Sequence, residues 1–130
     1  MGAVSTVILD GGMGRELQRR GAPFRQPEWS ALALIEAPQY VLQAHQAFIR
    51  AGARIITSNS YAVVPFHIGE QRFAEHGLAL AERAGRLARQ AQKRAGQVPV
   101  VEQGVAGRRH ALGFGGSSEP CSPEPCKDVP

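Results

Sequence analysis

An aspartate followed closely by glycines ends a short apolar run near the N-terminus, in "ILDGGMGREL", residues 8–17. The apolar run predicts a buried strand, so the Asp10 carboxylate would stand at the carboxyl end of that strand. A carboxylate there can bind an ammonium or hydroxyl group, and Gly11 would let a ligand approach the backbone closely. The alternative is that Asp10 caps the next helix and that the glycines only make the turn.

The same glycines do not match a phosphate-binding loop. The segment "GGMG", residues 11–14, lacks the G-x-G-x-x-G spacing, and G-x-x-x-x-G-K-[ST] is absent from the 130 residues. No acidic residue closes a second strand about 20 residues later, as a dinucleotide site requires. The spacing therefore disfavours a nucleotide ligand.

A second polar cluster, "TSNSY", residues 57–61, follows the apolar pair Ile55 and Ile56. We interpret residues 53–61 as a strand whose carboxyl end carries five hydrogen-bonding side chains. In parallel α/β folds, ligands bind where such strand ends meet the following loops. The location favours a site lining, and the alternative is a solvated loop with Asn59 in a turn.

The histidines and cysteines give weaker signals. His45 and His76 fall on predicted helices, where packing or surface roles are expected, whereas His67 follows the second strand and could reach the site. Cys121 and Cys126 form a C-x4-C pair without the C-x2-C spacing and the second pair typical of zinc sites. We expect solvated thiols there, with neither a disulfide framework nor a metal.

The elements that position these residues alternate between strand and helix. Strands are predicted at 6–11, 53–61 and 98–101, and helices at 15–20, 29–35, 38–51 and 70–95. Strands at intervals of about 45 residues imply parallel βα units and an α/β fold. Each of the two longer helices has an apolar stripe that should face the core. The stripe of 38–51 consists of Val41, Ala44, Phe48 and Ala51, and that of 70–95 consists of Phe73, Leu80, Ala84, Leu87, Ala91 and Ala95.

Composition predicts one globular domain and indicates which classes of partner to expect. The chain is 43% hydrophobic and 20% charged, with a net charge of +4. The basic residues of 72–94 are typical of a solvated helix face, and aromatics are only 6%, so we expect no nucleic-acid partner.

No secretion signal or membrane span is evident, so a cytoplasmic location is expected. Residues 1–107 form the predicted domain, and 108–130, with four of the nine prolines, an irregular tail.

Two of these stretches and the helix that follows them resemble a known family. "ILDGGMGRELQRRG" and "WSALALIEAPQYVLQAHQAFIRAGARIITSNSYA" are similar, in order, to the N-terminal part of the homocysteine S-methyltransferases, from about Thr6 to Gly107. The resemblance implies a homocysteine-binding domain with the fold of a TIM (β/α)8 barrel, of which residues 1–107 are a part. It also implies that Asp10 and Gly11 contact the amino-acid end of homocysteine and that Asn59 and Tyr61 lie near the substrate.

The activity that the resemblance implies is methyl transfer. A donor such as S-methylmethionine or S-adenosylmethionine methylates the zinc-bound thiolate of homocysteine, giving methionine. In the family, three cysteines on later strands hold the zinc, which lowers the pKa of the thiol. Their adjacent cysteine pair has no counterpart here, so we assign substrate-binding residues but no catalytic or metal-ligating ones.

The chain also departs from the family in length and in its last residues. A barrel of this type needs about 250 residues, so we expect only its first three βα units, truncated after the third strand. After Ala106 and Gly107 the sequence leaves the family pattern, and we hypothesise an out-of-frame or truncated ending. Three strands cannot close, so the open edge invites self-association and the fragment should be inactive alone. The alternatives are a small amino-acid-binding module or a protein-interaction module.

Overall fold

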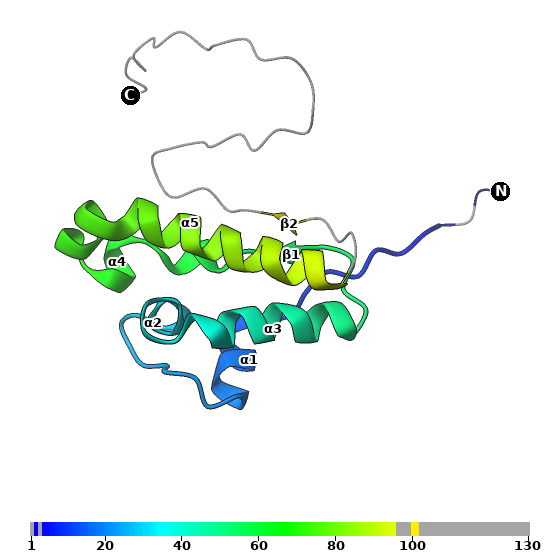
Figure 1. The fold of residues 1–130 in the computed structure, drawn as a ribbon, viewed down its shortest axis with the longest axis horizontal. Helices are drawn as coiled ribbons and strands as arrows, with labels where there is room; N and C mark the ends of the chain where they lie inside the picture. Colours follow the sequence, from blue (N-terminus) through cyan, green and yellow to red (C-terminus); the bar gives the residue numbers. More distant parts are fainter. Residues whose placement is uncertain (1, 3, 96–99, 102–130) are drawn as a thin grey trace, which may run out of the picture.

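The computed structural model describes residue 2, residues 4–95 and residues 100–101. Five α-helices, one 3-10 helix and two short strands follow one another in these residues (Figure 1). Their bounds are α1 Met13–Arg19, α2 Ser30–Glu36, α3 Pro38–Arg50, β1 Ile56–Thr57, η1 Asn59–Ala62, α4 Pro65–Ile68, α5 Glu70–Ala95 and β2 Val100–Val101.

The backbone pairing is parallel, as predicted, but shorter than predicted. Leu9 forms a single parallel bridge with Ile55, and β1 pairs with β2 through Ile56 and Val100. The three segments therefore lie in the order of the sequence, with β1 in the middle. The expected strand over residues 6–11 is wrong in extent, since among the described residues only this bridge forms.

Exposure explains why the first strand stays short. Parallel pairing is stable when both faces of the sheet are covered. Val7, Ile8 and Leu9 are 53%, 58% and 60% exposed, so within the described part of the chain they gain little from burial. Each exposed side chain forgoes part of the about 1.5–3 kcal/mol that full burial provides.

The two long helices agree closely with the sequence pattern. α5 spans Glu70–Ala95, the predicted range, and α3 begins with Pro38 in its first turn. Gly52, with φ of 109°, then turns the chain towards β1 in a conformation that side chains disfavour. The face that α5 buries is built from small residues and one leucine: Gly77, Leu80, Ala84, Gly85, Ala88 and Ala91. Ala51 and Ala95, predicted on the core stripes, are exposed.

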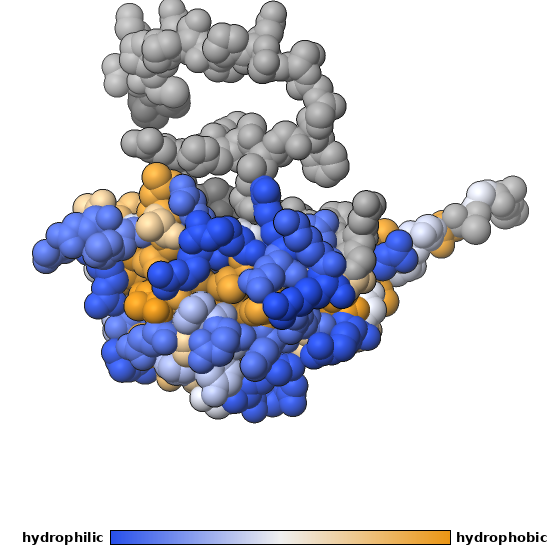
Figure 2. Space-filling model, in the orientation of Figure 1, coloured by the Kyte–Doolittle hydropathy of each residue, from blue (hydrophilic) through white to orange (hydrophobic). Residues whose placement is uncertain are grey.

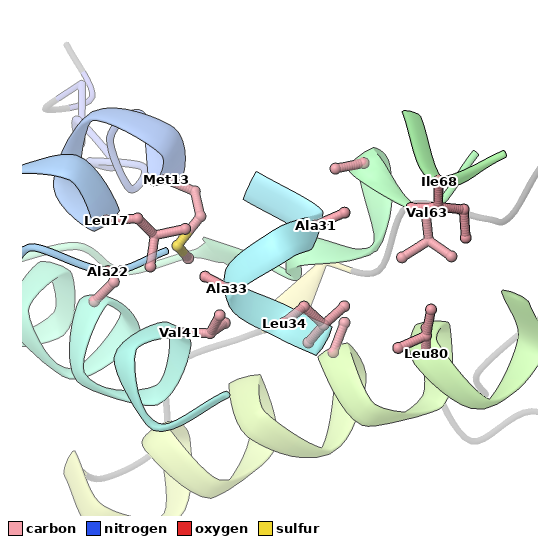
Figure 3. Packing of buried hydrophobic residues seen from close by; sticks show 13 residues of the cluster. Met13, Leu17, Ala22, Ala31, Ala33, Leu34, Val41, Val63, Ile68 and Leu80 are labelled. Carbon is pink, nitrogen blue, oxygen red and sulfur yellow. The ribbon is translucent and has the colours of Figure 1, made fainter. Parts of the chain in front are cut away.

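The hydrophobic core lies where α1, α2, α3 and α5 meet. In Figure 3 side chains from all four helices point towards one another, joined by Val63 and Ile68. The larger side chains Leu17, Leu34, Val41 and Val63 are completely buried. Figure 2 shows a largely hydrophilic outer face, with apolar surface along the seam between α5 and the α2–α3 layer. Among the described residues, no helix is both long and apolar enough to cross a bilayer.

Candidate functional site

Asp10 lies at the carboxyl ends of two neighbouring parallel segments. Its Oδ2 atom accepts a 2.7 Å hydrogen bond from the Thr57 amide, and its Oδ1 atom accepts a 3.3 Å bond from the Thr57 hydroxyl. The helix-cap alternative is wrong, since Gly12 is the N-cap of α1 and no side chain caps it. The half-buried carboxylate keeps free lone pairs, so it can still accept bonds from a ligand.

Gly11, the next residue, is exposed and lies against α3. A β-carbon added at Gly11 would come within 2.9 Å of the Cε1 atom of Phe48. Two non-bonded carbon atoms essentially never lie this close, so one of them would have to move. Packing therefore favours a glycine here, because any side chain would force the Phe48 ring to move, and the lack of a side chain leaves the backbone beside Asp10 open.

The polar stretch after β1 turns inwards rather than into solvent. Ser58, Asn59 and Ser60 are 0%, 0% and 4% exposed, so the solvated-loop alternative is wrong. The Asn59 Nδ2 group donates a 2.9 Å bond to the Ser30 carbonyl. Its Oδ1 atom is buried and has no partner among the described residues. A buried acceptor left unpaired costs about 1–3 kcal/mol, so a ligand donor or a water is the expected partner.

Tyr61 completes this cluster at the surface. The residue is 40% exposed, and its hydroxyl oxygen accepts a 2.8 Å hydrogen bond from the hydroxyl of Ser30. Ser30 is itself 1% exposed and forms the first residue of α2. Asn59 and Tyr61, both predicted from the sequence, are thus brought together by a serine that the sequence analysis missed.

The histidines lie apart from these contacts. His45 is fully buried in α3, as the predicted packing role requires, and burial lowers its pKa from 6.5 to about 4. The Nδ1–H group of His67 donates a 2.9 Å hydrogen bond to the Pro27 carbonyl oxygen. It lines an open groove of about 570 Å³ beside α4 and the start of α5. The lining of that groove includes neither Asp10 nor Asn59.

The resemblance implies a zinc site, but residues 4–95 contain no set of side chains that could form one. No group of three or more histidine, cysteine, aspartate or glutamate side chains lies close enough to hold a metal within residues 4–95. Both cysteines, Cys121 and Cys126, lie outside the described residues, as do His110 and the predicted tail at 108–130. What the described residues offer is a cluster of hydrogen-bonding groups, not a metal centre.

Relatives of known activity match most of the chain. Selenocysteine methyltransferase from Astragalus bisulcatus is 37% identical over 86 residues, covering 65% of this chain and 25% of that protein. Homocysteine S-methyltransferase 3 from Arabidopsis thaliana is 38% identical over 82 residues, covering 63% of this chain and 22% of that protein. This chain therefore spans about a quarter of the length of these curated relatives.

The fold agrees with a solved structure. The metallated form of the homocysteine methyltransferase MmuM from Escherichia coli superposes with a TM-score of 0.62 at 30% identity. The match covers 74% of this chain and 36% of that one. The family model described as homocysteine S-methyltransferase matches residues 7–120, past the boundary predicted at Gly107, which stays a prediction. The chain belongs to the homocysteine S-methyltransferase family.

Proposed function

We propose that this chain is the homocysteine-binding N-terminal portion of a zinc-dependent S-methyltransferase built on a (β/α)8 barrel. In this reaction a donor such as S-methylmethionine or S-adenosylmethionine gives its methyl group to the homocysteine thiolate, producing methionine. Zinc, when bound by the enzyme, supplies the low thiol pKa that makes the thiolate available. Residues 1–107 supply the amino-acid-binding part, and we expect no turnover from this chain alone.

The contact between Asp10 and Thr57 supports this proposal most directly. It joins the carboxyl ends of two adjacent parallel segments, the edge at which α/β barrels bind their substrates. An α-amino acid presents an ammonium group and a carboxylate. Asp10 can accept from the first, and the exposed Gly11 amide and the Tyr61 hydroxyl can donate to the second.

The buried oxygen of Asn59 adds a second argument for a polar ligand. Nδ2 is committed to Ser30, so Oδ1 is the atom left to accept from a ligand ammonium group or from a water molecule. Its position two residues after Thr57 keeps it next to the Asp10 contact along the chain. We therefore assign Asp10, Gly11, Asn59 and Tyr61 to substrate binding.

Homocysteine binding by the purified chain tests the proposal. Isothermal titration or ligand-observed NMR should detect homocysteine, and Asp10→Asn should weaken binding about tenfold, as expected for loss of one charged contact. Glu82→Gln, at an exposed carboxylate of α5, is the matched control and should bind as the parent does. Failure of the parent chain to bind homocysteine contradicts the proposal.

A methyl-transfer assay with added zinc tests the other part of the proposal, that this chain alone gives no turnover. Homocysteine binding without donor-dependent methionine formation is the expected result, because the described residues contain no zinc-ligand cluster. Turnover by the chain alone would contradict the expected inactivity and show that Cys121 and Cys126, or other residues beyond those described, complete a working site.

A protein-interaction module is the second candidate, favoured by the exposed apolar segment at Val7, Ile8 and Leu9. Asp10 and Ile8 use their backbone groups to bond with residues 54–55, so the backbone groups of Leu9 face the other side. A strand of a second copy could pair there. Size-exclusion chromatography should then show a defined oligomer that Leu9→Lys converts to monomer, and a monomeric parent chain would exclude this candidate.

A further inference from the structure

We propose that Ser30 is a positioning residue, which holds the Tyr61 hydroxyl as a hydrogen-bond donor for the carboxylate of an α-amino-acid ligand. The inference rests on the proposed function, because it needs Tyr61 to lie at the homocysteine site. It adds a residue from α2 and assigns a direction to one hydrogen bond.

The direction follows from the contact between the two hydroxyl groups. Ser30 Oγ donates to the Tyr61 oxygen at 2.8 Å, so the Tyr61 proton is left for another acceptor. Ser30 is 1% exposed, and a buried hydroxyl proton without an acceptor is costly. Its proton is therefore committed to Tyr61, a residue that is 40% exposed and can meet a ligand.

The same serine also fixes the neighbouring site residue. Its carbonyl oxygen accepts from Asn59 Nδ2 at 2.9 Å, while its hydroxyl holds Tyr61. Asn59 and Tyr61 are both in η1, so one residue of α2 sets the position of this turn through two bonds. A displacement of Ser30 would move both groups together.

The backbone just before Ser30 is built to place it. Trp29 has φ of 49°, a conformation that is a clear outlier for a bulky side chain. Its amide donates to the Arg25 carbonyl at 2.7 Å, and its ring meets Phe24 edge-on with centroids 5.8 Å apart. These contacts offset a local strain that a simple start of a helix would not require.

The ligand group that suits this arrangement is an anionic acceptor. A phenol that already accepts from Ser30 is polarised as a donor, and charged acceptors form the stronger hydrogen bonds. A carboxylate on an α-carbon satisfies it, with the ligand ammonium left for Asp10. A thiol or an apolar group would gain nothing from the serine.

A double-mutant cycle on ligand affinity tests the proposal in the full chain. Titrations with homocysteine should show affinity reduced about 2- to 10-fold by Ser30→Ala and by Tyr61→Phe, with the double variant no weaker than Tyr61→Phe alone. Ser30→Thr keeps the hydroxyl and should restore the affinity. Additive losses in the double variant would overturn the proposal, since Ser30 would then act independently of Tyr61.

A second probe separates positioning from general structure. 3-Aminopropanethiol keeps the amine and thiol of homocysteine but lacks the carboxylate, so Ser30→Ala and Tyr61→Phe should leave its affinity unchanged. Equal losses for both probes would overturn the proposal. If Ser30→Ala fails to fold, Tyr61→Phe alone must still lose affinity for homocysteine selectively. A parent chain that binds neither probe contradicts the proposed function itself, whereas normal homocysteine binding by Ser30→Ala contradicts only this inference.

Discussion

The Asp10 carboxylate and the Thr57 amide are joined by a 2.7 Å hydrogen bond between residues 47 positions apart in the sequence. Because the acceptor is charged, we expect Asp10→Ala to lower the free energy of unfolding by about 2 kcal/mol. Asp10→Asn keeps one acceptor oxygen and should lose less. Urea denaturation followed by circular dichroism measures both changes. Equal stability of Asp10→Ala and the parent chain would show that this bond adds nothing to the fold.

Stability should also depend on pH through His45. Burial holds its folded pKa at about 4, below the ordinary 6.5, so the folded state keeps the ring neutral. As pH falls below 6.5 the unfolded state takes up the proton first, and stability is lost until about pH 4. The loss in this window is about 3 kcal/mol.

Two variants isolate that histidine. Urea midpoints between pH 7 and pH 4 should fall much less for His45→Leu than for the parent chain, whereas His76→Gln, at an exposed histidine, should follow the parent. Glu16 affects stability only at lower pH than His45 does, because its hydrogen bond with Arg19 holds the Glu16 pKa at about 2. A parent-like pH slope in His45→Leu would contradict the assignment.

A side chain at Gly11 should destabilise the fold while Phe48 is present. Gly11→Ala brings a β-carbon to 2.9 Å from the Phe48 ring, and we expect a loss of about 1–3 kcal/mol. Gly12→Ala is the control, because its nearest contact would be 3.7 Å away. Thermal unfolding compares the two. In a Phe48→Ala background the penalty of Gly11→Ala should disappear, and its persistence would point to a backbone cause.

Arg83 should anchor α5 to the end of α2. Its Nη1 group lies 3.3 Å from the Leu34 carbonyl and 3.5 Å from the Ile35 carbonyl, two groups that the last turn of a helix leaves unpaired. Arg83→Met keeps the aliphatic stem and should cost about 1 kcal/mol. Arg86→Met, whose exposed ion pair spans 3.8 Å, should change the unfolding free energy by less than about half of that.

The long helices were predictable because their signals are local. Periodic apolar residues lie within each segment, Gly52 with its positive φ follows the end of α3, and the bounds of α5 match the prediction. α4, at Pro65–Ile68, escaped because a single turn has no period to detect. The strands were overextended, since pairing depends on neighbours that lie far along the chain.

The candidate site likewise contains residues that the sequence predicted and one that it did not. Asp10 and the stretch after β1 were identified by their place at predicted strand ends, where polar residues stand out. Ser30 gave no such signal. Its partners Asn59 and Tyr61 are 29 and 31 residues away, and a serine at the start of a helix is usually read as a cap.

The distance in sequence between Asp10 and Thr57 also means that the site is itself a product of folding. A ligand that touches both Asp10 and the residues after Thr57 has no counterpart to bind in the unfolded chain. Its binding free energy is therefore added to the stability of the folded form and raises the melting temperature with ligand concentration. A thermal shift on adding homocysteine would thus report assembly and recognition in one measurement.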